Sequence, residues 1–131
     1  MEKFPFHPPL VHFPIAFYFL ELVLLILWAA KKDEHYRRFA LFTFRLGYLA
    51  MMAAMLAGLK DTGGIEGLGG KVRPHFYAAM TVFCFYTLRA IFWKFGKENS
   101  TRYAFLLIAS AVLGNFLVTL AGFLGGRLVY G

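Results

Sequence analysis

Four long apolar runs, separated by short polar stretches, organise the chain from one end to the other. The runs cover residues 10–30, 39–59, 74–95 and 103–124, and each has about the 20 residues that a helix needs to cross the hydrocarbon core of a bilayer. Strands are disfavoured at that depth, because an open sheet cannot satisfy its backbone hydrogen bonds in lipid. Because the connections are short, consecutive helices should be antiparallel. The pattern predicts an all-α fold, a transmembrane up-down-up-down four-helix bundle formed by residues 1–131 as a single domain.

Composition and charge favour a lipid bilayer as the main partner. Of the 131 residues, 60% are hydrophobic and 19% are aromatic, which fits poorly with a soluble domain of this size. The net charge of +7 does not indicate a nucleic-acid partner, because the basic residues cluster between apolar runs, where they set membrane orientation. One side of the predicted bundle carries more of them than the other, which favours both termini outside the cytoplasm. The richer side has Lys31, Lys32, Arg37, Arg38, Lys94, Lys97 and Arg102, and the other has Lys3, Lys60, Lys71, Arg73 and Arg127.

Histidines open two of the four runs. The first begins His7-Pro8-Pro9-Leu10-Val11-His12-Phe13-Pro14, and Pro14 is expected to bend that helix beside His12. The third begins Arg73-Pro74-His75 and runs in the same direction as the first, so His12 and His75 should lie at a similar shallow depth. Facing each other across the bundle, these two imidazoles can ligate one haem iron axially. A single cysteine, Cys84, excludes the covalent attachment of a c-type haem, which leaves haem b.

Other polar groups at the same end of the bundle extend this prediction. Lys71, Arg73 and Arg127 can pair with the haem propionates. Small residues gather in this half of the second and fourth helices, where they either allow close packing or leave room for a flat cofactor. Two alternatives stay open. His7, His12, His75 and Asp61 offer ligands for a bare zinc, copper or iron ion, or the histidines are structural.

Charged residues inside the runs predict a buried contact. Glu21 and Arg45 are equally far from the middle of the first connection, so they should meet at one depth and form a structural ion pair. Arg89 lies near the end of its run and is expected to extend its side chain to the membrane surface. Trp28 and Trp93 have the positions of an interfacial aromatic belt. The glycine-rich connection 61–70 is predicted to be a flexible loop, with a lid over a site as the sharper alternative.

The opening motif resembles a bacterial membrane-protein family known as domain of unknown function 2231. That family combines such an opening with an aspartate after the second helix, a histidine at the start of the third, and a closing glycine-glycine-x-leucine-valine-tyrosine run. The corresponding residues here are His7, Pro8, His12, Phe13, Pro14, Asp61, His75, Gly125, Gly126, Leu128, Val129 and Tyr130. The resemblance covers the whole chain and implies a multi-pass protein of the bacterial inner membrane, but it implies no activity. Relatives fused or adjacent to cytochrome-like modules suggest a redox role by analogy.

Two hypotheses for function follow from the sequence. The first is a small b-type cytochrome-like protein that binds one haem between the first and third helices and exchanges electrons with a periplasmic redox protein, a quinol or a small oxidant. The second is a non-catalytic membrane subunit or a small transporter, with a metal-ion site or purely structural histidines. No catalytic residues are predicted, because the end that carries the histidines lacks a serine for a hydrolase triad. Self-association into a homo-oligomer is compatible with either hypothesis.

Overall fold

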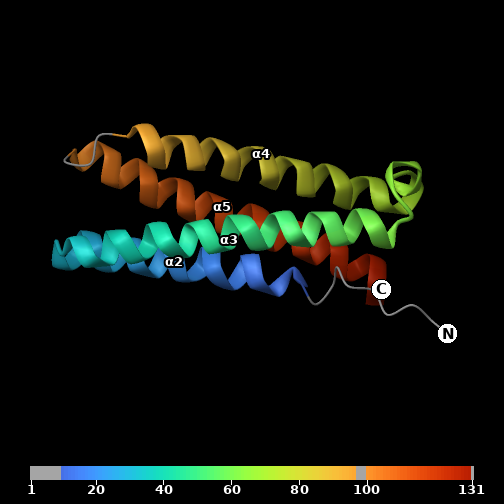
Figure 1. Ribbon diagram of the computed structural model, residues 1–131, viewed down its shortest axis with the longest axis horizontal. Coiled ribbons are helices and arrows are strands. Elements are labelled where there is room, and N and C mark those ends of the chain that lie inside the picture. Colours follow the sequence, from blue (N-terminus) through green and yellow to red (C-terminus); the bar gives the residue numbers. More distant parts are fainter. Residues whose placement is uncertain (1–9, 97–99, 131) are drawn as a thin grey trace.

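The four predicted helices are present in the structure, a computed structural model that describes residues 10–96 and 100–130. Within these residues the chain is helical throughout its length apart from short connections, and the all-α bundle is confirmed (Figure 1). Two short 3-10 helices, η1 and η2, lie in the glycine-rich connection. The elements are α2 (His12–Lys31), α3 (Glu34–Asp61), η1 (Ile65–Gly67), η2 (Gly70–Val72), α4 (Arg73–Phe95) and α5 (Thr101–Tyr130).

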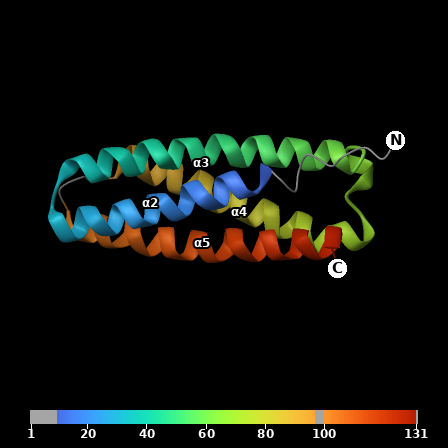
Figure 2. The same cartoon turned by 90° about the horizontal axis from the view of Figure 1, so that it is seen from below.

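The helices run up and down around a common core, as predicted (Figures 1 and 2). Helix α2 packs against α3 and α5, and α4 packs against α5, so α2 and α4 are diagonal. The fourth side of the bundle differs, because α3 and α4 touch each other least. We call the end that carries residues 62–72, the start of α2 and the end of α5 the glycine-loop end. The opposite end, with the α2–α3 turn and the α4–α5 connection, is the basic-loop end.

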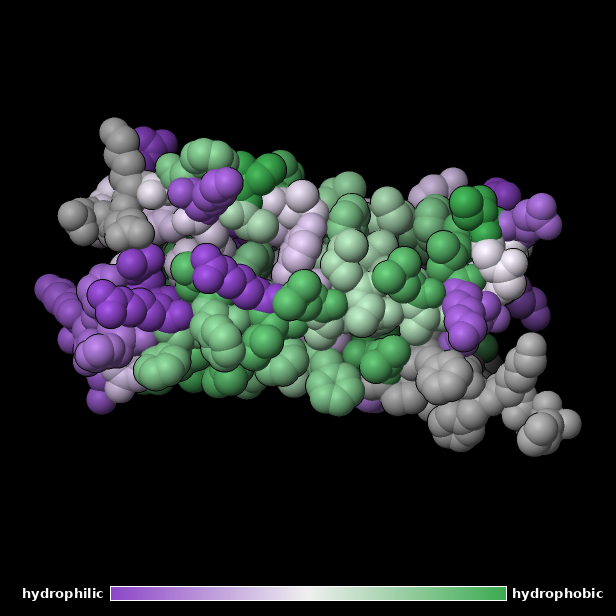
Figure 3. Space-filling model, in the orientation of Figure 1, coloured by the Kyte–Doolittle hydropathy of each residue, from purple (hydrophilic) through white to green (hydrophobic). Residues whose placement is uncertain are grey.

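The surface is that of a multi-pass membrane protein. All four long helices are long and apolar enough to span a bilayer. Large apolar side chains point outward along them, among them Phe19, Leu49, Phe105 and Phe116. Figure 3 shows the result on one face, a broad hydrophobic band with hydrophilic residues gathered at both ends. An apolar surface of this extent would favour aggregation in water, whereas it is normal for a protein surrounded by lipid.

The helix boundaries have local causes. Lys32, with a φ of 53°, ends α2, and its N–H donates to the carbonyl of Trp28 at 2.8 Å. Asp33 caps α3 by accepting a hydrogen bond from the His35 N–H at 2.9 Å. Pro14, which was expected to bend the helix beside His12, lies in the first turn of α2; this helix begins at His12, directly after a turn residue, Val11. A missing N–H costs nothing there, because first-turn donors have no intrahelical acceptor.

Two stacked tyrosines lie in the buried core. Tyr18 of α2 and Tyr86 of α4 are both fully buried, with ring centroids 3.6 Å apart and an interplanar angle of 11°. Gly47 and Gly114 make this contact possible. A Cβ added at Gly47 would lie 2.8 Å from the Tyr18 ring, and one at Gly114 would lie 2.5 Å from the Tyr86 hydroxyl. Two diagonal helices therefore meet at this level through their aromatic side chains.

Candidate functional site

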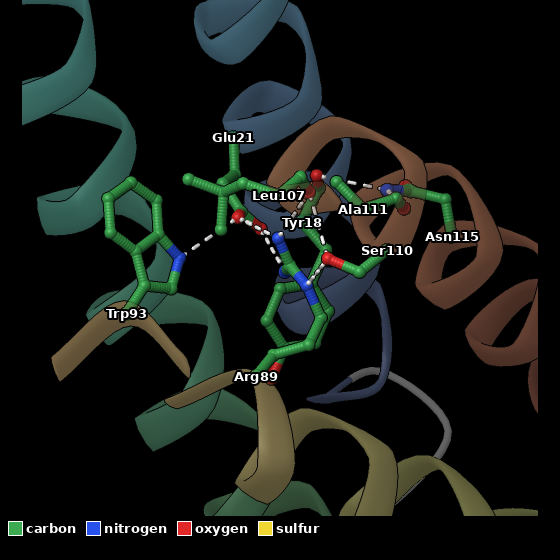
Figure 4. A network of polar contacts seen from close by, with 8 residues as sticks. All are labelled: Tyr18, Glu21, Arg89, Trp93, Leu107, Ser110, Ala111 and Asn115. Atoms are coloured by element: carbon green, nitrogen blue, oxygen red, sulfur yellow. Dashed lines mark hydrogen bonds and ion pairs between the residues drawn. The ribbon is translucent and has the colours of Figure 1, made fainter. Parts of the chain in front are cut away.

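A buried ion pair occupies the basic-loop half of the bundle, and its partners differ from those predicted. Glu21 of α2 accepts two hydrogen bonds from Arg89 of α4, at 2.7 Å and 2.9 Å, in a bidentate arrangement (Figure 4). The predicted Glu21–Arg45 pair is wrong, since Arg45 is exposed on α3. The prediction that Arg89 extends to the membrane surface is also wrong, because this side chain is 2% exposed.

The remaining donors around this pair are also satisfied. Arg89 donates from Nε to the Ser110 hydroxyl at 2.9 Å and from Nη2 to the Leu107 carbonyl at 3.3 Å. Trp93 donates from its indole N–H to Glu21 at 3.4 Å. A buried ion pair with this many partners holds α2, α4 and α5 in one register. We assign the cluster a structural role, which is the role predicted for the ion pair.

The two tryptophans therefore do not form an interfacial belt. Trp93 is 8% exposed and contacts the ion pair, as described above. Trp28 is also 8% exposed, and its indole N–H donates to the Glu34 carboxylate at 3.1 Å. Both rings are buried in the bundle, because each indole N–H donates to a carboxylate of this chain and not to a lipid headgroup or water.

A cleft of about 690 Å³ lies between α3 and α4 in the glycine-loop half. These two helices make few contacts with each other, and small residues on both sides, Gly58 and Ala79, leave the space between them unfilled. Its lining is almost entirely apolar, and exposed lining residues such as Leu56, 66% exposed, show that it opens at the surface. The full lining is Met52, Met55, Leu56, Gly58, Leu59, Asp61, Thr62, Ile65, Leu68, Val72, His75, Phe76, Ala79, Met80, Phe83, Gly125 and Leu128.

The cleft is closed toward the middle of the bundle and at the glycine-loop end. Phe83 forms its inner limit, where the ring stacks near Tyr48 at a centroid distance of 6.4 Å. One turn further, the hydroxyls of Tyr48 and Thr87 are 3.0 Å apart and link α3 to α4. At the other end, apolar residues of the connection, Ile65 and Leu68 among them, contribute to the lining. The connection thus takes part in the cleft wall through η1 and η2.

His75 is the imidazole that reaches this cleft. It is half-buried, lines the cleft, and its Nδ1 lies 3.0 Å from the carbonyl oxygen of Ala121 on α5. Because a carbonyl accepts only, Nδ1 carries the proton, and in the neutral ring Nε2 carries the lone pair. Gly125 permits the approach, since a Cβ there would lie 2.9 Å from Cε1 of His75. This hydrogen bond fixes the tautomer in the way that backbone carbonyls commonly do for metal-ligating histidines.

His12 does not face His75 as predicted. It is exposed, and it lines neither the large cleft nor a second cavity of about 60 Å³ in the bundle core. That cavity is lined instead by its neighbours Val11, Pro14 and Ile15, together with His75. The core-facing positions of α2 are Pro14, Tyr18, Glu21, Leu25 and Trp28. His12 does not lie on this stripe. The two imidazoles are therefore kept apart by the angular position of His12 around the axis of α2, and not by depth in the bundle.

The other predicted ligands lie at the rim of the cleft or beyond it. Asp61 lines the cleft from an exposed position at the end of α3. Lys71, Arg73 and Arg127 are exposed residues of the glycine-loop end and do not contribute to the lining. His7 lies outside the described residues. Within residues 10–96 and 100–130, no group of three histidine, cysteine, aspartate or glutamate side chains has the arrangement of a metal site.

Sequence reasoning missed the cleft itself, although it foresaw small residues in this half. The prediction placed a cofactor between the first and third helices, whereas the open space lies between the second and third. One signal was present: apolar Ile65, Leu68 and Val72 stand at intervals within the glycine-rich connection. Apolar side chains in an otherwise small and polar connection indicate that it packs against something.

Comparison with known proteins agrees with this architecture. The family model described as "Predicted membrane protein (DUF2231)" matches residues 3–131, nearly the whole chain. Comparisons with curated proteins and with solved structures found no match.

Proposed function

We propose that this chain, which belongs to the DUF2231 family of predicted membrane proteins, binds one haem b in the α3–α4 cleft through Nε2 of His75. The observation that carries the proposal is the His75–Ala121 hydrogen bond, which orients an imidazole at the wall of a large apolar cleft. A volume of about 690 Å³ lies within the range of roughly 300–1,000 Å³ typical of cofactor and ligand pockets. An apolar lining with one nitrogen ligand suits a macrocycle that is apolar except at its metal and its carboxylates.

The proposed ligation needs only one histidine. Haem iron is held by a single histidine in globins and peroxidases, and by a histidine and a methionine in cytochromes c. Met52, Met55 and Met80 line the cleft with His75, and they are the candidates for a second ligand from this chain. The exposed Lys71, Arg73 and Arg127 at the same end give a positive rim toward which haem carboxylates would be drawn.

Electron transfer is the activity that we propose for the bound cofactor. The cleft lies at one end of the bundle, so the exchange partner would be a redox protein at that surface, a quinol or a small oxidant. Because the cleft opens on an apolar surface at Leu56 and Met52, a lipid-dissolved quinol can approach it from the side. The basic-loop half would then serve as the scaffold that holds the helices in register.

Absorption spectroscopy of the purified protein tests this proposal. Protein from haem-replete cells should show a Soret band that shifts on reduction. His75→Gln, which keeps a donor toward Ala121 but is a poor iron ligand, should lose the band, and Ala79→Leu, which fills the cleft, should weaken it. His12→Ala is the matched control and should keep the wild-type spectrum. A colourless wild-type protein that takes up no added haem would refute the proposal.

A second candidate is a non-catalytic membrane subunit in which His75 is structural. The observation in its favour is the same hydrogen bond, because it joins α4 to α5 whether or not a cofactor is present. Here the wild-type protein would take up no haem, and His75→Gln would change only thermal stability. Tightly bound zinc or copper, found by elemental analysis and lost in His75→Gln, would indicate instead the metal-ion site considered from the sequence.

A further inference from the structure

Arg45 is a charged residue on the membrane-facing surface of α3. It is exposed, and the residues that share its face, Phe42 and Leu49, are 59% and 66% exposed. Within the described part of the chain it makes no hydrogen bond or ion pair, because Glu21, its predicted partner, is engaged by Arg89. A charged side chain at membrane depth has a high free energy without a partner. We therefore expect Arg45 to bind a partner from outside the bundle.

The depth of Arg45 and the direction of its side chain point to the nearer membrane surface. It lies eleven residues after the first residue of α3, about 16 Å along the helix at 1.5 Å per residue. Side chains on a helix lean toward its N-terminus, which for α3 is the basic-loop end. Arg38 is exposed two turns nearer that end and lies on the same face, because seven residues return almost to the same angle.

A second copy of this chain does not offer a carboxylate at that depth. Among the described residues, Glu21 is the acidic side chain within the apolar part of the helices, and it is 0% exposed. The other described acids lie in the connections or at helix ends: Asp33, Glu34, Asp61 and Glu66. At the depth of Arg45 in the helix, self-association therefore brings none of these acids to it. Phosphate at the membrane surface is the anion that every bilayer supplies.

We propose that Arg45 and Arg38 form a binding site for the phosphate of an anionic phospholipid on the outer face of α3. The two guanidinium groups approach one headgroup from two levels, with Arg45 drawing the phosphate below the plane of its neighbours. Phe42 and Leu49 contact the acyl chains. Lys31 and Lys32, exposed at the same end, favour a lipid with net negative charge over a zwitterionic one.

Thermal unfolding in detergent with added lipid tests this site. Phosphatidylglycerol should raise the Tm of the wild-type protein more than phosphatidylcholine of the same chain length, because a ligand of the folded state stabilises it. Arg45→Leu should lose roughly half of this shift or more, since one of two phosphate contacts is gone. Arg45→Lys should keep an intermediate shift, because the charge remains but the planar fork is lost.

Arg102→Leu is the matched control, because it removes an exposed arginine at the same end from another helix. It should keep most of the shift. Inorganic phosphate should not reproduce the effect of phosphatidylglycerol, since it lacks the acyl chains. An equal shift in wild type and Arg45→Leu would overturn the proposal. So would a wild-type protein without preference for phosphatidylglycerol, and a carboxylate on another membrane protein would then be the expected partner of Arg45.

Discussion

The two halves of the bundle use their polar residues in opposite ways. In the basic-loop half, Glu21 and Arg89 are buried and bind each other, and the stacked Tyr18 and Tyr86 fill the space beside them. In the glycine-loop half, an apolar cleft lies between α3 and α4, and His75 lines its wall. One half of the bundle thus fixes the helix register through a buried ion pair, whereas the other half has an open apolar cleft.

The largest effect is expected when one member of the ion pair is removed. Glu21→Ala or Arg89→Ala leaves the other charge buried alone, which should cost about 3–5 kcal/mol of unfolding free energy. Replacing both residues by methionine should restore most of the loss, since a well-packed apolar pair often matches a buried ion pair. Chemical denaturation in detergent measures both. Arg45→Leu is the control and should stay near wild type in lipid-free detergent; a loss as large as that of Arg89→Ala would reinstate Arg45 as the partner.

The next effect concerns the tyrosine stack. Gly114→Ala places a Cβ 2.5 Å from the Tyr86 hydroxyl, so the Tyr86 side chain must shift and the stack with Tyr18 is disturbed. Overpacking of this kind costs about 1–3 kcal/mol. The same substitution should leave any ligand binding at the cleft unchanged, because Gly114 does not line it. Loss of ligand affinity together with stability would show that the two halves are not separable.

Two adjacent glycines of α5 allow a test in the glycine-loop half. A Cβ at Gly125 would lie 2.9 Å from the His75 ring, whereas at Gly126 it meets nothing within 4 Å. Gly125→Ala should therefore displace His75 and abolish haem uptake. Gly126→Ala should leave uptake intact and raise helix stability by up to about 1 kcal/mol, because alanine is the better helix former. Haem titration and thermal unfolding of both variants check this, and equal behaviour would contradict the role given to His75.

The smallest effect is expected at His12. Its side chain is exposed and lines neither the large cleft nor the smaller cavity described above, so His12→Ala should change the unfolding free energy by no more than about 0.5 kcal/mol. It should also leave the absorption spectrum of the holoprotein unchanged. A lost or shifted Soret band in this variant would return the site to the two-histidine arrangement expected from the sequence.

The fold could be predicted because the apolar runs have the length of a bilayer and little else satisfies a backbone in lipid. The partner of Glu21 could not be predicted by depth alone, since depth does not say which face of a helix a residue occupies. The sequence nevertheless indicates which face of α4 carries Arg89. The buried residues of this helix, Val82, Tyr86, Arg89 and Trp93, recur at helical spacing. Arg45 lies instead between Phe42 and Leu49, which point outward.

The candidate site was predictable only in part. The position of His75 at the start of a helix, and small residues in the same half, placed the predicted site at the end where the cleft lies. The pairing with His12 failed because that residue lies beside, and not on, the core-facing stripe of α2. The small number of contacts between α3 and α4 has no counterpart in the apolar pattern of either helix, since both patterns would be the same if the helices were in close contact.

We assign haem binding to the glycine-loop half and helix register to the basic-loop half. Haem uptake and stability, measured together for His75→Gln and Glu21→Gln, test this assignment most directly. We expect His75→Gln to lose the Soret band while its Tm stays close to that of the apoprotein. We expect Glu21→Gln to lower the Tm strongly while the fraction that remains folded still binds haem. A wild-type protein that binds no haem, or a Soret band that survives in His75→Gln, would contradict the account.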